Sequence, residues 1–281
     1  MQAFNIYYSL SVDNRGRIQR LFFVLVFAIL LYKCFSGLLV HQIGENPILY
    51  QEVDIVYWLF MIAGIPDFIS GNVALSFDIL LLTTSLISFT FPRQNISTVI
   101  FCVCYFIYFI LFNMTAGHHF NNVGILILSF PFIFKTLEFG FCWKFARFTF
   151  MFIMFSAGVW KIVRGNFSHP HQLAMIILNN KVSSLAMGEK TIQNNVIRWL
   201  IQHPFWPQLV WDILIILELS FVWGFFTLKK DGFLMVNYLL FFAGGLLLTG
   251  IFNIENFLFL LTLLPVLRFI AKRPGFNAVK A

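Results

Sequence analysis

The sequence predicts an all-α, polytopic integral membrane protein. Of its 281 residues, 59% are hydrophobic and only 11% are charged, whereas a soluble domain carries about 45–50% apolar and about 25% charged residues. Its apolar runs recur at lengths close to the roughly 20 residues that a helix needs to cross about 30 Å of hydrocarbon. These runs are continuous and lack the alternation of polar and apolar residues that marks a β-barrel, which favours helices.

The apolar runs predict about eight transmembrane helices in a single membrane domain over residues 1–281. We expect the first of them to be retained, because it lacks the short apolar core and small-residue cleavage site of a signal peptide. The stretch 56–69 is apolar but short, and it ends in Gly64-Ile65-Pro66. It predicts a re-entrant or interfacial segment, or a helix buried among the others, instead of a ninth crossing. The predicted spans are 19–40, 72–91, 95–114, 122–139, 142–164, 207–228, 232–250 and 251–271.

The placement of basic residues supports this count. With eight crossings every basic cluster at a helix end falls on one side of the membrane, as the positive-inside rule requires of the cytoplasmic side. We therefore expect a multi-pass protein of a bacterial inner membrane with both termini in the cytoplasm and the long loop 165–206 outside. The residues concerned are Arg15, Arg17, Arg20, Arg93, Lys144, Arg147, Lys229, Lys230, Lys272, Arg273 and Lys280.

The outer loop 165–206 contains a predicted amphipathic helix. Within residues 191–203, Ile192, Val196, Trp199 and Leu200 recur at helical spacing, and Pro204-Phe-Trp-Pro207 follows. This pattern is typical of an interfacial helix with aromatic anchors. Two alternatives remain open, a helix that caps the bundle and a lid over an outward-facing cavity.

The net charge of +7 does not require a nucleic-acid partner. Basic residues at helix ends explain it, and the sequence has no basic stripe interleaved with aromatic residues of the kind that contacts nucleic acid. The four cysteines form no CxxC pair, and the histidines lack carboxylate or cysteine neighbours at ligand spacing, which argues against a metal centre. The expected partners are the lipid bilayer and, on one hypothesis, a protein in a membrane complex.

Ionisable residues inside a bilayer are costly and are candidates for function. Lys161 follows Arg147 by fourteen residues, about 21 Å along a helix, so it should lie near the outer end of the same span. One interpretation is a lysine that extends to the interface. The other is an amine held out of water in a cavity, where it acts as a base, and this one fails if the nitrogen is open to solvent or bound in a carboxylate pair with no adjoining hollow. The other candidates are Lys33, Asp78, Asp212, Glu218 and Glu255, and for Asp212 and Glu218 we expect a salt bridge or hydrogen bond to a neighbouring helix.

One segment is similar to a known family. It reads Arg147-Phe-Thr-Phe-Met-Phe-Ile-Met-Phe-Ser-Ala-Gly-Val-Trp-Lys161, and it resembles the arginine-led helix ending in Ala-Gly-Val-Lys-Lys of the vitamin K-dependent gamma-carboxylases and the horizontally transferred transmembrane-domain (HTTM) proteins. The resemblance implies that Lys161 is the base that deprotonates a reduced quinone, with His119 as a second catalytic residue. It also implies that Trp160 and Tyr238 bind the quinone cofactor.

The likeness extends over most of residues 90–270. Residues 218–260 look like two family helices joined by a short basic turn, and His119 falls near the family's Asn-Asn-His. The family carries a functional histidine where this chain has Leu240. Two hypotheses therefore stand, a quinone-linked lysine-base enzyme and a non-catalytic membrane subunit or scaffold that keeps the fold without the chemistry. A transporter is a weaker third, because paired broken helices and an inverted repeat are not evident.

Overall fold

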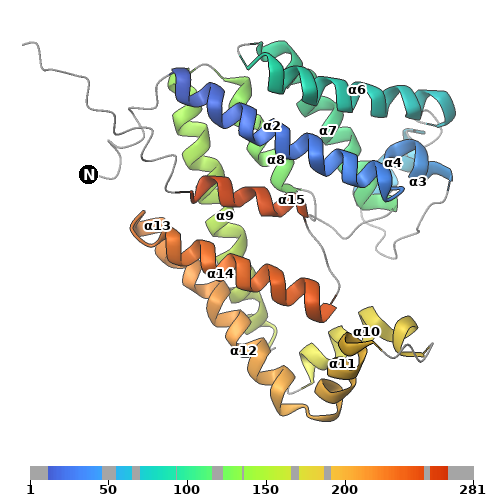
Figure 1. Ribbon diagram of the computed structural model, residues 1–281, viewed down its shortest axis with the longest axis vertical. Helices are drawn as coiled ribbons and strands as arrows, with labels where there is room; N and C mark the ends of the chain where they lie inside the picture. Colours follow the sequence, from blue (N-terminus) through green and yellow to red (C-terminus); the bar gives the residue numbers. More distant parts are fainter. Residues whose placement is uncertain are drawn as a thin grey trace, which may run out of the picture. The chain divides into compact units, whose positions relative to one another are not determined.

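The computed structural model describes residues 12–45, 55–64, 70–92, 94–115, 123–134, 136–165, 171–186, 191–249 and 254–264 (Figure 1). All regular structure in these ranges is helical, which confirms the predicted fold class. Six helices are long and apolar enough to cross a membrane, which fits an integral, multi-pass membrane protein. These candidate spans are Arg15–Ile43, Gly71–Thr90, Asn95–Asn113, Glu138–Val163, Phe205–Phe226 and Asp231–Leu248.

The described residues do not confirm the other two predicted spans. Over 122–139 the structure has α8 (Val123–Ser129), continued by the 3-10 turn η1 (Phe130–Ile133). This apolar helix rises only about 16 Å at 1.5 Å per residue, roughly half of the hydrocarbon thickness. Pro131 has no N–H for an α-helical hydrogen bond, which explains the change to 3-10 geometry. The predicted span 251–271 is described only over α15 (Ile254–Phe257) and η4 (Leu258–Thr262).

The chain forms two compact units. The first comprises residues 1–146, 253–262 and 266–281. Within it α2, α6 and α7 lie side by side (Figure 1), and α9 begins here and continues into the second unit. Besides α8, η1, α15 and η4, its described helices are α2 (Val12–Phe35), α3 (Val40–Glu45), α4 (Ile55–Ile62), α6 (Gly71–Thr90), α7 (Asn95–Thr115) and the start of α9 (Thr136–Val163).

An aromatic core holds the first unit together. Phe22 and Phe23 of α2, Phe101 of α7 and Phe132 of η1 are fully buried. The ring of Phe23 meets that of Phe101 edge to face with centroids 5.2 Å apart, and Phe22 lies 5.3 Å from Phe132. Such pairs add about 0.5–1.5 kcal/mol each to the burial of the rings.

A buried ion pair joins the two ends of the first unit. The Nζ of Lys33 in α2 pairs with the carboxylate of Glu255 in α15. The same nitrogen donates to the Tyr108 hydroxyl at 2.9 Å and lies 3.9 Å from the centroid of Phe112. Nearby, the backbone N–H of Gly124 donates to Asn256 Oδ1 at 3.0 Å. The sequence marked Lys33 and Glu255 as separate candidates and did not predict that they pair.

The short helix α4 settles one alternative for the stretch 56–69. Trp58, Leu59, Met61 and Ile62 all have exposed side chains, so the helix is not buried among the others. Gly64, with φ of 64°, follows the helix, and this conformation favours glycine. Residues 65–69, with Pro66, lie outside the described residues.

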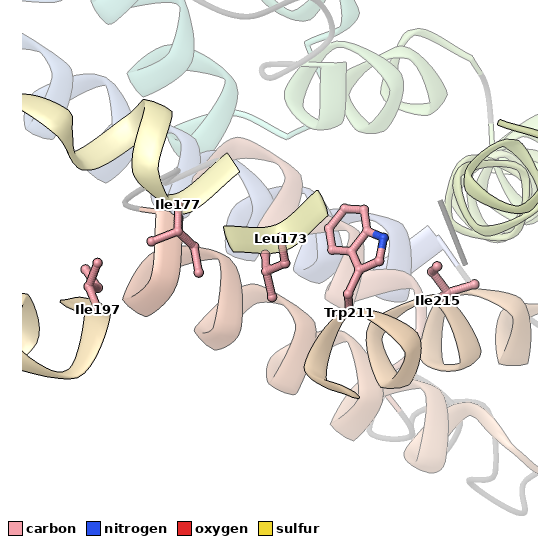
Figure 2. Close-up of a cluster of buried hydrophobic side chains, with 5 residues drawn as sticks. All are labelled: Leu173, Ile177, Ile197, Trp211 and Ile215. Carbon is pink, nitrogen blue, oxygen red and sulfur yellow. The ribbon is translucent and has the colours of Figure 1, made fainter. Parts of the chain in front are cut away.

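The second unit comprises residues 147–252 and 263–265. Figure 2 shows a core cluster in which Leu173 and Ile177 of α10 meet Ile197 of α11 and Trp211 and Ile215 of α12. Its described elements are the remainder of α9, α10 (Gln172–Ala186), α11 (Ile192–Gln202), α12 (Phe205–Leu219), η2 (Ser220–Val222), α13 (Trp223–Phe226), α14 (Asp231–Gly244) and the π-helical turn η3 (Gly245–Thr249).

The predicted helix at 191–203 is confirmed as α11. Its N-cap is Thr191, whose side chain accepts from the N–H of Asn194 at 3.1 Å, a favourable cap. Leu200 is buried with Ile197, whereas Val196 and Trp199 are exposed. The helix therefore packs one face against the second unit and presents a second apolar face outward. Its location at a membrane interface stays a prediction.

The Lys33–Glu255 pair can be tested by removing one partner or both. Lys33→Met should lower the free energy of unfolding by about 3–5 kcal/mol, because it leaves a buried carboxylate without a counter-charge. The double variant Lys33→Met/Glu255→Leu should recover most of this loss, since no charge remains buried. Denaturant titration in detergent micelles, followed by circular dichroism, measures both. A double variant as unstable as the single one would contradict the role of the pair.

Candidate functional site

The candidate site lies at the end of α9, where Lys161 occupies the last turn as the sequence predicted. The Nζ of Lys161 donates to Oε1 of Glu218 in α12. The lysine side chain is 20% exposed and the glutamate side chain only 2%. The expected salt bridge of Glu218 to a neighbouring helix is therefore confirmed. The amine is thus bound in a carboxylate pair, and its depth in a membrane stays a prediction.

Close approach of two helices explains why this pair forms. Gly158 lies one turn before Lys161, and a Cβ built there would stand 3.1 Å from Glu218 Cβ and 3.2 Å from Leu219 Cγ. The missing side chain allows α9 and α12 to approach closely, as small residues do between membrane helices. The side chains of Lys161 in α9 and Glu218 in α12 can therefore form a direct ion pair between the two helices.

Aromatic rings surround the amine on its other sides. The Nζ of Lys161 lies 5.0 Å from the ring centroid of Trp211 in α12 and 5.6 Å from that of Phe241 in α14. Both distances fall within the range of cation–π attraction. The rings therefore favour a cation at this position as well as limiting the access of water to it.

Two buried polar atoms at this site have no hydrogen-bond partner among the described residues. They are Oε2 of Glu218, an acceptor, and Nε1 of Trp211, a donor. These residues are seven apart on α12, so they share one face of the helix. Figure 2 shows the indole nitrogen of Trp211 on the side of the ring that faces Ile215 in this view. Since buried polar atoms are usually bonded, this donor and acceptor suit a ligand hydroxyl.

The other predicted site residues lie apart from the amine or outside the described residues. His119 is among the latter. The ring of Trp160 is 56% exposed and lies 4.8 Å from the guanidinium carbon of Arg164. Tyr238 is buried with its ring 4.9 Å from that of Phe150, and it approaches the site only through Phe241, whose ring it stacks on at 6.4 Å.

The structure also describes Leu240, the position at which the resembled family carries a functional histidine. Leu240 is exposed, whereas Asn237 in the preceding turn of α14 is buried and donates to Ser220 Oγ at 2.9 Å. Sequence reasoning missed both Asn237 and Trp211. The place of Trp211 seven residues before Glu218 was the available signal for it, because that spacing puts both on one helix face.

A second ion pair fixes the other end of α9 in this unit. Arg147 Nη2 lies 2.6 Å from Asp231 Oδ1, and Nη1 donates to the carbonyl of Gly224 at 2.8 Å. Arg147 is therefore level with the turn that carries Lys229 and Lys230, as expected if it marks the basic side of the span.

The remaining acidic candidates, Asp212 and Asp78, each have partners within their own unit. Asp212 accepts from Gln208 Nε2 of its own helix at 2.7 Å, so the expectation of a partner on a neighbouring helix is wrong. In the first unit Asp78 accepts from the N–H groups of Val40 and His41 at 3.1 and 2.9 Å and lies 2.7 Å from His41 Nδ1. Asp78 thus caps the start of α3, which explains its burial.

Comparisons with known proteins yield no match to a family model, a curated protein or a solved structure. The likeness to the carboxylases therefore depends on the residues quoted above.

The close approach at Gly158 gives a testable consequence. Gly158→Val should lower the free energy of unfolding by about 1–3 kcal/mol, because the added methyl groups force α9 and α12 apart. The matched control is Gly232→Val in α14, where nothing lies within 4 Å of an added Cβ. Both variants place the same side chain in a helix, so any excess effect at Gly158 reports the helix contact. Equal loss in the two variants, measured by thermal unfolding in micelles, would rule out that contact as the cause.

Proposed function

We propose that this protein is an intramembrane enzyme in which Lys161 and Glu218 transfer a proton to and from a reduced quinone. The observation that carries the proposal is the buried pair itself, with one carboxylate oxygen and one indole N–H beside it and without partners among the described residues. The resemblance of residues 147–161 to the carboxylase helix supplies the substrate class.

The proposed mechanism uses the proton that the pair shares. Passage of this proton from Nζ to the Glu218 carboxylate would give a neutral amine beside a neutral acid. The neutral Nζ then accepts the proton of a bound hydroxyl, and the resulting ammonium remains next to the oxyanion that forms. Trp211 Nε1 donates to that oxyanion and orients it. The reduced quinone, when bound, would supply two electrons, and dioxygen would be the oxidant that accepts them.

The orientation of the site follows from the same proposal. Lys161 lies in the last turn of α9, and Arg147, fourteen residues before it in the same helix, pairs with Asp231 beside the basic turn Lys229-Lys230. If basic residues mark the cytoplasmic side of a bacterial inner membrane, the amine lies near the outer surface and both termini lie in the cytoplasm. This assignment keeps the count of eight crossings. Six are the candidate spans, the seventh is the short helix Val123–Ile133 with the residues that follow it, and the eighth is the predicted span 251–271.

A second candidate function is a non-catalytic membrane subunit or scaffold. The observation in its favour is that Lys33, Arg147 and Lys161 each pair with a carboxylate within the chain. Internal pairing is what a purely structural role requires. The exposed Leu240, where the family has a histidine, points the same way.

Turnover in proteoliposomes tests the enzymatic proposal. With vitamin K hydroquinone as the probe, Lys161→Ala should reduce quinol-dependent oxygen uptake to background, since the proton acceptor is gone. Arg164→Ala is the matched control, because it removes an exposed cation three residues further along. Trp211→Phe should raise KM roughly two- to tenfold through loss of one hydrogen bond. Unchanged uptake in Lys161→Ala, in folded protein, would remove the lysine from the mechanism.

Co-purification separates the two candidates. Wild-type protein extracted in a mild detergent should carry a quinone, detectable by its ultraviolet spectrum after solvent extraction, if the enzymatic proposal is correct. A protein partner at fixed stoichiometry, together with no extractable quinone and no quinol-dependent oxygen uptake, would instead assign the scaffold role. Size-exclusion chromatography with light scattering measures that stoichiometry.

A further inference from the structure

One buried charge differs from all the others that the structure describes. Seven charged side chains in the described ranges are buried. Six of them lie against an oppositely charged group or, for Asp78, a histidine. The seventh is Arg15 of α2, which has no carboxylate partner among these residues. Charges in a membrane protein are normally paired when they are buried, so this arginine calls for an explanation.

The hydrogen bonds of Arg15 leave much of its guanidinium unused. The side chain donates twice, from Nη2 to Asn95 Oδ1 at 2.9 Å and from Nη2 to the carbonyl of Phe132 at 2.7 Å. Both acceptors are neutral. A guanidinium has five N–H donors, and Nε is buried without a partner in the described part of the chain. The residue as a whole is 8% exposed, so the side chain is held in place and does not extend freely into water.

The position of Arg15 indicates what could balance its charge. It is the first residue of the candidate span Arg15–Ile43, and its acceptor Asn95 is the first residue of the span Asn95–Asn113. The guanidinium therefore lies at the start of two candidate spans and not in the middle of one. The helices α2 and α7 both begin there, and their N-termini add positive potential. Arg17 and Arg20, exposed on the same turns of α2, add more.

We propose that Arg15 is a binding site for a phosphate oxyanion at this membrane surface, either the headgroup of an anionic phospholipid or free phosphate. The planar fork of arginine matches phosphate oxygens, and it tolerates desolvation better than an ammonium. Asn95 and Phe132 hold the guanidinium through Nη2 and leave the other donors to the anion. The site lies in the first unit and is independent of the Lys161–Glu218 pair.

Native mass spectrometry of the full-length protein in detergent tests the site directly. Titration with phosphatidylglycerol should give one tightly retained lipid per chain, and phosphatidylcholine at the same concentration should not. Arg15→Gln should weaken this retention roughly tenfold or more, the worth of one charge-assisted hydrogen bond. Arg17→Gln is the matched control, because it removes an equal charge from an exposed position on the same helix. It should change retention by less than about threefold, as a screened surface charge does.

A second arm distinguishes the two sources of phosphate. Lipid-depleted protein is heated with sodium phosphate or, as a control for ionic strength, with sodium chloride. A rise in melting temperature that is specific to phosphate and absent in Arg15→Gln would assign the site to free phosphate, whereas lipid retention without such a rise would assign it to a headgroup. The proposal fails if the wild-type protein shows neither. It also fails if Arg17→Gln reduces lipid retention as much as Arg15→Gln does. The wild-type measurements of lipid retention and melting temperature need no variant, so poor folding of a variant does not affect them.

Discussion

The structure depends on one constraint, that a charge placed in a low-dielectric interior must be matched by another. Lys33 and Glu255 meet in the first unit, and Arg147 and Asp231 meet in the second. Each pair joins helices that are far apart in the sequence, so the same contacts that neutralise charge also fix which helices are neighbours. Lipid tails are as apolar as leucine and cannot supply this selectivity.

Composition and run length were sufficient to predict the helical fold and most of the spans, because the cost of unbonded backbone in hydrocarbon leaves few alternatives. The failures have local causes. Pro131 converts the end of α8 into a 3-10 turn and shortens that helix. The partner of Lys33 lies more than two hundred residues away, and no periodicity links such distant positions.

The candidate site shows a similar division. The place of Lys161 at the end of its helix followed from counting residues after Arg147, and the need of Glu218 for a partner followed from its depth. That each is the partner of the other depends on Gly158, whose role becomes evident only when α12 is seen against it. Trp211 was missed because an aromatic residue in a span is ordinarily an anchor or part of the core.

The return of residues 254–262 to the first unit has a consequence for biosynthesis. Lys33 enters the bilayer early, while Glu255 is still about 220 residues from being translated. At 5–20 residues per second the ribosome needs roughly 10–45 s to reach it. Until Glu255 is made the amine must remain hydrated or be held by another neighbour, and Tyr108, translated 75 residues after Lys33, is available for the later part of that interval. The N-terminal half of this protein is thus made before the charge that balances its buried lysine.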